Sequence, residues 1–184
     1  DTYETCTPIQ VYPSRLAGAN LTGSTIRFYA LNAQGEISHM ILEDATGDLH
    51  QYGIITGVSE VSAGLVTNSA YTYDVGGVKQ VFTSDTTIYN LKCDPCQVKM
   101  ESDTTVERLY NLTEVEVDSI NGNTIVDAQN RSYTLSDNVA VYVYENNEYQ
   151  LTSLERVSGG DYRLTAWYDK PENEGGRIRV ILAR

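Results

Sequence analysis

The stretch Val139-Ala140-Val141-Tyr142-Val143-Tyr144 carries the clearest structural signal in this chain. Val139, Val141 and Val143 fall on one face if the stretch is extended, because successive side chains of a strand point to opposite sides. The pair Asn146-Asn147 follows directly, and Asn is typical of tight turns. The stretch therefore predicts a β-strand that ends in a turn.

Short apolar runs separated by turn signals recur on both sides of this stretch. Residues 25–29 and 70–75 are rich in β-branched and aromatic side chains, which favour strands. Helical signals are confined to residues 106–112 and 151–157, and both segments are too short to set the fold class. We therefore predict an all-β protein built from short antiparallel strands, arranged in small barrel-like or sandwich modules.

An internal repeat suggests how the strands are divided. A polar turn, an aromatic residue and a Ser-Asp corner occur in this order within residues 74–85, and again within residues 127–137. A repeated order of this kind is typical of related structural units. We predict two related β modules, an N-terminal one over residues 1–112 with a hairpin-rich middle, and a C-terminal one over residues 113–184.

The composition excludes some classes of partner. The chain has 184 residues and a formal net charge of −12. Nucleic acid is not expected as a partner, because its phosphates are bound by Lys and Arg. Membrane insertion is not expected, because no apolar run approaches the roughly 20 residues of a spanning helix. An acidic chain of ordinary polarity fits a secreted protein.

The motif Cys93-Asp94-Pro95-Cys96 has three chemical interpretations. It could be a redox pair, half of a zinc site or a small structural disulfide. No βαβ pattern surrounds it, and no second pair of ligands has zinc-site spacing. A local disulfide between Cys93 and Cys96, or a pair of free thiols, is therefore favoured. Cys6 is left over as an odd cysteine.

No cofactor is expected, although two acidic loops are candidates for binding calcium. Calcium takes about 6–8 oxygen ligands, and neither loop has the spacing of an EF-hand. Acidic turns without a metal are the favoured alternative. The candidate ligands are Asp44, Asp48, Asp169, Glu172 and Glu174.

Aromatic residues near the C-terminus suggest a second kind of site. Tyr162, Trp167 and Tyr168 are candidates for stacking on sugar rings, but packing in the core or between strands is the favoured alternative. No residue is assigned a catalytic role. The histidines, His39 and His50, occur without a G-x-S-x-G motif or another nucleophile pattern.

A pattern of strands and turns runs through residues 37–48, 52–54, 132–144, 149–154, 167–170 and 175–181. These segments span most of the chain, and together they resemble a β-rich region of surface proteins from Clostridia-type bacteria that also carry S-layer homology domains. The resemblance implies secretion to the bacterial cell surface or cell wall, attachment through separate domains, and a structural or adhesive role. It implies no catalytic residue.

We therefore expect a non-enzymatic structural or adhesive module whose partners are other surface proteins or cell-wall polysaccharide. One alternative is a carbohydrate-binding module for cell-wall or host glycans, which would expose coplanar aromatic side chains. Another is a fragment of a secreted hydrolase, which would hold carboxylates with perturbed pKa values in a cleft.

Overall fold

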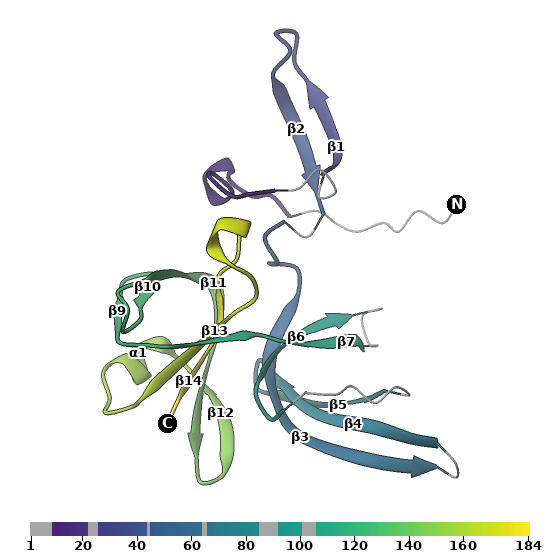
Figure 1. Ribbon diagram of the computed structural model, residues 1–184, viewed down its shortest axis with the longest axis vertical. Helices are drawn as coiled ribbons and strands as arrows, with labels where there is room; N and C mark the ends of the chain where they lie inside the picture. Colours follow the sequence, from purple (N-terminus) through teal and green to yellow (C-terminus); the bar gives the residue numbers. More distant parts are fainter. Residues whose placement is uncertain (1–8, 22–25, 44, 64–65, 85–91, 101–105) are drawn as a thin grey trace.

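The computed structural model describes residues 9–21, 26–43, 45–63, 66–84, 92–100 and 106–184 (Figure 1). Strands dominate these residues, and the predicted all-β fold is confirmed. The short helical elements are η1 (Pro13–Arg15), α1 (Leu154–Ser158) and η3 (Glu172–Glu174). The described part of the chain contains no helix that is long and apolar enough to cross a membrane.

The described strands form three sheets. The first is a hairpin of β1 (Ile26–Leu31) and β2 (Ile37–Leu42), which projects from the rest of the molecule (Figure 1). The second has the antiparallel order β5 (Val78–Ser84), β4 (Val66–Val75), β3 (Gln51–Ala63), β6 (Pro95–Met100) and β7 (Val106–Asn111).

The third sheet curls into a half-barrel. Its order is β8 (Thr113–Glu116), β13 (Leu164–Tyr168), β14 (Ile178–Ala183), β11 (Ser132–Glu145), β10 (Thr124–Val126) and β9 (Ser119–Asn121), and β12 (Glu148–Thr152) also pairs with β11. The β11–β14 pair is parallel, whereas the other pairs are antiparallel. The chain passes from the second sheet to the third between β7 and β8, where the sequence predicts its module boundary.

The strand predicted from residues 139–144 lies within β11, and both of its faces are covered. Val141 and Val143 are buried in the core of the half-barrel, and Val139 packs against that core. Tyr142 points to the opposite side and is also fully buried. This part of β11 is therefore buried on both faces and separates two cores.

Local sequence explains how β11 ends. Asn146 and Asn147 have φ angles of 53° and 63°, which is the left-handed conformation that a type I′ hairpin turn requires at both central positions. Asn adopts this conformation more readily than most residues. The turn brings β12 back antiparallel to β11, as the Asn pair predicts.

The two larger sheets share a core. This cluster, which we call the shared core, contains Ile54 from the second sheet and Tyr142, Trp167, Val180 and Leu182 from the third. Each side chain in it is at most 3% exposed. Because burial of apolar side chains is the main stabilising term in folding, the shared core makes the two sheets energetically interdependent.

The two helical predictions have different outcomes. Residues 151–157 include α1, and the Ser153 side chain caps it by accepting a hydrogen bond from the backbone N–H of Arg156 over 3.4 Å. Residues 106–112 contain β7 instead, so the helical prediction was wrong there. Pairing with β6 and burial of Val106 and Leu109 outweigh the weak local helical preference.

Candidate functional site

The buried guanidinium of Arg179 organises a polar cluster between the second and third sheets. Arg179 lies on β14, and its side chain is 2% exposed. Its Nε donates to Oδ2 of Asp169 over 2.9 Å, and its Nη1 donates to Oδ1 of Asp48 over 2.6 Å and to Oγ of Ser136 over 3.0 Å. Its Nη2 donates to the Thr46 carbonyl and lies 2.9 Å from Asp169 Oδ2.

Four hydrogen bonds and an ion pair thus engage the guanidinium, as the burial of an Arg side chain requires. The Arg179 guanidinium carbon also lies 4.9 Å from the centre of the Tyr52 ring, within the range of a cation–π contact. The Tyr52 hydroxyl lies 2.7 Å from the Gly47 carbonyl oxygen and 3.1 Å from Asp169 Oδ2. We call Thr46, Asp48, Tyr52, Ser136, Asp169 and Arg179 the Arg179 cluster.

The cluster keeps Asp48 and Arg179 charged. Burial alone would raise the pKa of Asp48, but the hydrogen bond and positive charge of Arg179 outweigh it and hold this pKa below its usual range. Burial likewise tends to lower the pKa of Arg179, and the contacts with Tyr52, Asp169 and Asp48 raise it overall. The cluster is therefore a paired ionic network inside the fold.

Two further basic side chains tie the N-terminal segment and the loop after β13 to this network. Arg15 follows Pro13 in η1, and its Nη1 donates to the Gly175 carbonyl over 2.9 Å. Its Nη2 lies 3.7 Å from Asp48 Oδ1. Lys170 Nζ donates to the Ala45 carbonyl over 2.9 Å. The two loops and η1 are thus held together by cations from three parts of the chain.

Glycine makes one of these approaches possible. Gly47 has a φ of +70°, and a Cβ there would lie 2.5 Å from Asp169 Oδ2 and 2.9 Å from the Tyr52 hydroxyl. Both the backbone conformation and the space therefore require glycine. The turn Thr46-Gly47-Asp48 places its carbonyl and carboxylate groups against Arg179 for this reason.

The loops predicted to bind calcium do meet, but around Arg179. The carboxylates of Asp48 and Asp169 face the guanidinium, which takes the position of a cation between them. Glu172 accepts a hydrogen bond from Thr134 Oγ1, and Glu174 lies beside it in η3. Asp44 lies outside the described residues. No group of three or more His, Cys, Asp or Glu side chains in the described ranges is arranged to hold a metal ion.

The predicted aromatic residues do not form one platform. Trp167 is 3% exposed and belongs to the shared core. Tyr162 packs against the half-barrel core, and its hydroxyl donates to Glu145 Oε1 over 2.9 Å. Tyr168 points to the side opposite Trp167 and stacks on Tyr133, with ring centres 5.7 Å apart. Of the three, Tyr168 is the one that lines a pocket.

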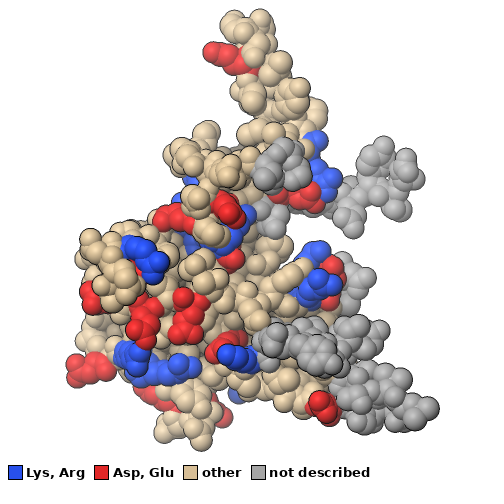
Figure 2. Space-filling model, viewed as in Figure 1, with Lys and Arg blue, Asp and Glu red and all other residues tan. Residues whose placement is uncertain are grey.

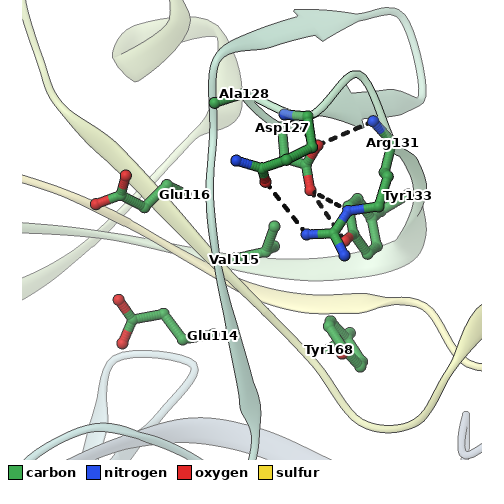
Figure 3. Close-up of a pocket in the computed structure, with 9 residues that line it drawn as sticks. Glu114, Val115, Glu116, Asp127, Ala128, Arg131, Tyr133 and Tyr168 are labelled. Carbon is green, nitrogen blue, oxygen red and sulfur yellow. Dashed lines mark hydrogen bonds and ion pairs between the residues drawn. The ribbon is translucent and has the colours of Figure 1, made fainter.

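This pocket lies between β8 and the turn before β11 (Figure 3). Its volume is about 210 Å³, too small for more than one or two sugar units. Figure 3 shows Glu114 and Glu116 extending from β8, apart from the Asp127–Arg131 pair. The lining residues are Glu114, Val115, Glu116, Asp127, Ala128, Gln129, Arg131, Tyr133 and Tyr168.

The carboxylate of Asp127 is fully engaged in holding the turn. Its Oδ2 accepts from Nε of Arg131 over 2.7 Å and from the Tyr133 hydroxyl over 3.2 Å, and its Oδ1 accepts two backbone N–H groups. Burial opposes ionisation, but these hydrogen bonds lower the pKa of Asp127 overall. Glu116 pairs with the exposed Arg163. Glu114 is therefore the acidic group at the pocket that the described interactions engage least.

A second polar contact joins the sheets at the other end of the shared core. The Tyr142 hydroxyl donates to Oδ1 of the buried Asp74 over 2.9 Å and accepts the backbone N–H of Gly76 over 3.2 Å. Burial and the negative charge of Asp74 both raise the pKa of Tyr142. The hydroxyl therefore stays protonated and donates to Asp74 at neutral pH.

The cysteines of the predicted disulfide differ in burial. In the structure Cys93 and Cys96 are free thiols, with Cys93 exposed and Cys96 buried in the core of the second sheet. Burial raises the pKa of Cys96 to about 12. The disulfide stays a prediction. Cys6 lies outside the described residues.

Sequence reasoning missed Arg179, although one signal was present. Arg179 interrupts the apolar run Ile178-Arg179-Val180-Ile181-Leu182, and a charged residue within a buried strand needs a partner.

The chain was compared with models of protein families, with curated proteins and with solved structures, and none of these comparisons gives a match.

Proposed function

We propose that this chain is a non-enzymatic structural or adhesive module of a bacterial surface protein, which holds its loops in a fixed arrangement for contact with other surface proteins. The observation that carries the proposal is the Arg179 cluster. It uses the side chains of both acidic loops to join the sheets, so these groups serve the architecture rather than a substrate or a metal.

Two other features support a structural role. The shared core and the Tyr142–Asp74 contact join the sheets at further points, and a unit joined at several points resists relative movement of its parts. The charges are mixed over the visible face (Figure 2), without a single-sign patch of the kind that steers nucleic acid. The resemblance described above supports placement at the cell surface.

The test is sedimentation of the purified chain with isolated envelopes of Clostridia-type bacteria, before and after protease treatment of the envelopes. A module that contacts surface proteins sediments with untreated envelopes and stays in solution with protease-treated ones. An Arg179→Met variant, in which the loops are no longer held, should sediment less. Failure of the wild-type chain to sediment with any envelope would count against the proposal.

The pocket supports a second candidate, binding of a short glycan segment. Tyr168 offers an aromatic face at the pocket, and the nearby Glu114 carboxylate can accept hydrogen bonds from sugar hydroxyls. This combination of one ring and one acceptor is small, so the expected affinity is weak. Burial of Trp167 removes the largest ring of the predicted platform, which is why glycan binding ranks second.

Protein-free cell-wall polysaccharide tests this candidate in the same assay. Glycan binding requires sedimentation with the polysaccharide and loss of it in the double variant Tyr168→Ala, Glu114→Gln. Tyr110→Ala is a matched control, because Tyr110 is an exposed tyrosine on β7 of the other large sheet. Equal binding by wild type and double variant would exclude the pocket.

A further inference from the structure

The β1–β2 hairpin exposes an unusual amount of apolar surface. Neither strand contains a buried residue, and no described side chain of the hairpin belongs to a core of the protein. Seven large apolar side chains on it each expose between 43% and 60% of their surface. These are Ile26, Phe28, Tyr29, Leu31, Ile37, Met40 and Ile41.

These side chains cover both faces of the hairpin. Phe28 lies opposite Ile41 on one face, and Tyr29 lies opposite Met40 on the other. A soluble two-stranded sheet with one dry face would show apolar and polar residues in alternation, and this hairpin does not. An isolated hairpin is only marginally stable in water. We therefore expect a partner to cover the apolar surface on both faces of this hairpin in the functional protein.

The hairpin is nearly neutral within a strongly acidic chain. Residues 26–43 contain one Arg and two Glu, a formal charge of −1, whereas the whole chain carries −12. Arg27 and Glu43 pair with each other at the base of the hairpin. Figure 2 shows the projecting hairpin as largely uncharged, with mixed charges on the body below it. The negative charge of the rest of the chain disfavours an anionic lipid surface as the partner that covers the hairpin.

The exposed area is suited to a protein interface. Aromatic side chains have areas of about 150–250 Å², so at these exposures the seven side chains together present several hundred Å². Each partner of a standard interface contributes about 800 Å². The hairpin therefore offers a large part of one side of a stable interface without any contribution from the body.

The outer edges of the hairpin point to what covers it. In the described sheets β1 and β2 pair only with each other, so each strand keeps one edge of unpaired backbone groups. A second hairpin of the same kind can pair antiparallel along such an edge, which places its apolar side chains beside identical ones on both faces of the joined sheet. Such pairing is self-complementary about a two-fold axis and introduces no unpaired charge.

We propose that the β1–β2 hairpin is a self-association element, which docks on the same hairpin of a second copy of this chain. Its projection from the body keeps the two acidic bodies apart while the neutral hairpins pair (Figure 1). Because the bodies repel each other, association should strengthen as salt screens their charge. This inference is independent of the proposed function, since it needs no other surface component.

Analytical ultracentrifugation of the purified chain over a range of concentrations tests it. We expect a concentration-dependent dimer, and at least a tenfold weaker association for the double variant Phe28→Lys, Met40→Lys, which places one charge on each face. The matched control is Val78→Lys, Val81→Lys on β5, two exposed apolar residues of another sheet edge. The control should dimerise like the wild type.

The emission of Trp167 shows whether each variant is folded, because Trp167 lies in the shared core and not in the hairpin. A wild-type chain that stays monomeric at high concentration and high salt would overturn the proposal. So would a folded hairpin variant that dimerises as tightly as the wild type, or a control that loses association equally. Binding of a monomeric chain to neutral lipid vesicles would show a lipid surface as the cover instead.

Discussion

The guanidinium of Arg179 and the carboxylate of Asp169 meet at 2.9 Å with both side chains almost excluded from solvent, 2% and 5% exposed. The two residues lie at the ends of neighbouring strands, Asp169 just after β13 and Arg179 within β14. From there Arg179 reaches back to Asp48, 131 residues earlier in the chain. The contact therefore links the half-barrel to the loop that precedes the second sheet.

Replacing Arg179 by Met should destabilise the protein strongly. The apolar side chain fits a similar volume, but it leaves the buried carboxylate of Asp169 without its cationic partner. Breaking a buried ion pair in this way typically costs about 3–5 kcal/mol in the free energy of unfolding. Urea unfolding followed by the emission of Trp167 measures this, because the single Trp reports on the shared core.

The control for this experiment is Arg163→Met. Arg163 pairs with Glu116, but the two side chains are 77% and 65% exposed, and exposed pairs contribute about 0–1 kcal/mol. The two variants remove the same chemical group from a buried and an exposed position. Equal losses of stability would contradict the role assigned to the Arg179 cluster.

The cluster also predicts a particular response to acid. In the folded protein the pKa of Asp48 is lowered, because Arg179 outweighs the effect of burial. In the unfolded chain Asp48 has an ordinary pKa of about 4. Its stabilising contribution is therefore complete above that value and is lost as the pH falls through the lower folded-state pKa.

Asp48→Asn removes this contribution. The variant should be less stable than the wild type at pH 6, and the difference should shrink toward pH 3, as measured by urea unfolding at each pH. Glu114→Gln serves as the control, since Glu114 is an exposed acid on β8 with no contact to Arg179 among the described interactions. A difference that stays constant from pH 6 to pH 3 would show that Asp48 does not gain stability from ionisation.

Local features of the fold could be predicted, because a strand or a turn depends on the same few neighbouring residues that form its sequence pattern. The alternation in residues 139–144 and the pair Asn146-Asn147 specify a strand and its turn through backbone geometry alone. The burial of Tyr142 could not be predicted in this way. Its partner Asp74 is 68 residues distant, and the alternation does not reveal that a second sheet covers that face.

In the candidate site, too, local features could be predicted from the sequence, whereas long-range contacts could not. The sequence marks Asp48 and Asp169 as candidate calcium ligands in acidic loops. Their partner in the structure, Arg179, could not be deduced, since it lies on a strand of otherwise apolar residues. Trp167 and Tyr168 are adjacent and were grouped as one platform. Strand geometry sends them to opposite faces, and only the packing of the second sheet decides which of them is buried.

Tyr142→Phe isolates the second contact between the sheets. The ring stays in the shared core, while the hydrogen bonds to Asp74 and from Gly76 are lost. Loss of a hydrogen bond to a buried polar group typically lowers the free energy of unfolding by about 1–3 kcal/mol. Urea unfolding should therefore show a lower midpoint concentration, while the dependence of the free energy on urea concentration stays unchanged. Tyr144→Phe is the matched control, because its exposed hydroxyl bonds only Asn147 over 3.3 Å among the described contacts. Equal effects of the two variants would show that the Asp74 contact adds nothing.

The two thiols of the C-x-x-C motif should differ sharply in reactivity. Burial raises the pKa of Cys96 to about 12, so at pH 8 only about one molecule in ten thousand carries the reactive thiolate. Cys93 is exposed and accessible to reagent. Iodoacetamide should therefore label Cys93 in the native protein at least about 100-fold faster than Cys96, and both at similar rates in urea.

Peptide mapping by mass spectrometry reads each cysteine separately, which also keeps Cys6 out of the comparison. Labelling of Cys96 should follow the unfolding transition, because reagent reaches it when the core of the second sheet opens. If neither Cys93 nor Cys96 is labelled until a reductant is added, the two form the disulfide that the motif suggests, and oxidation must then reorient the chain that precedes β6. If both are labelled rapidly in the native state, Cys96 is not part of a closed core.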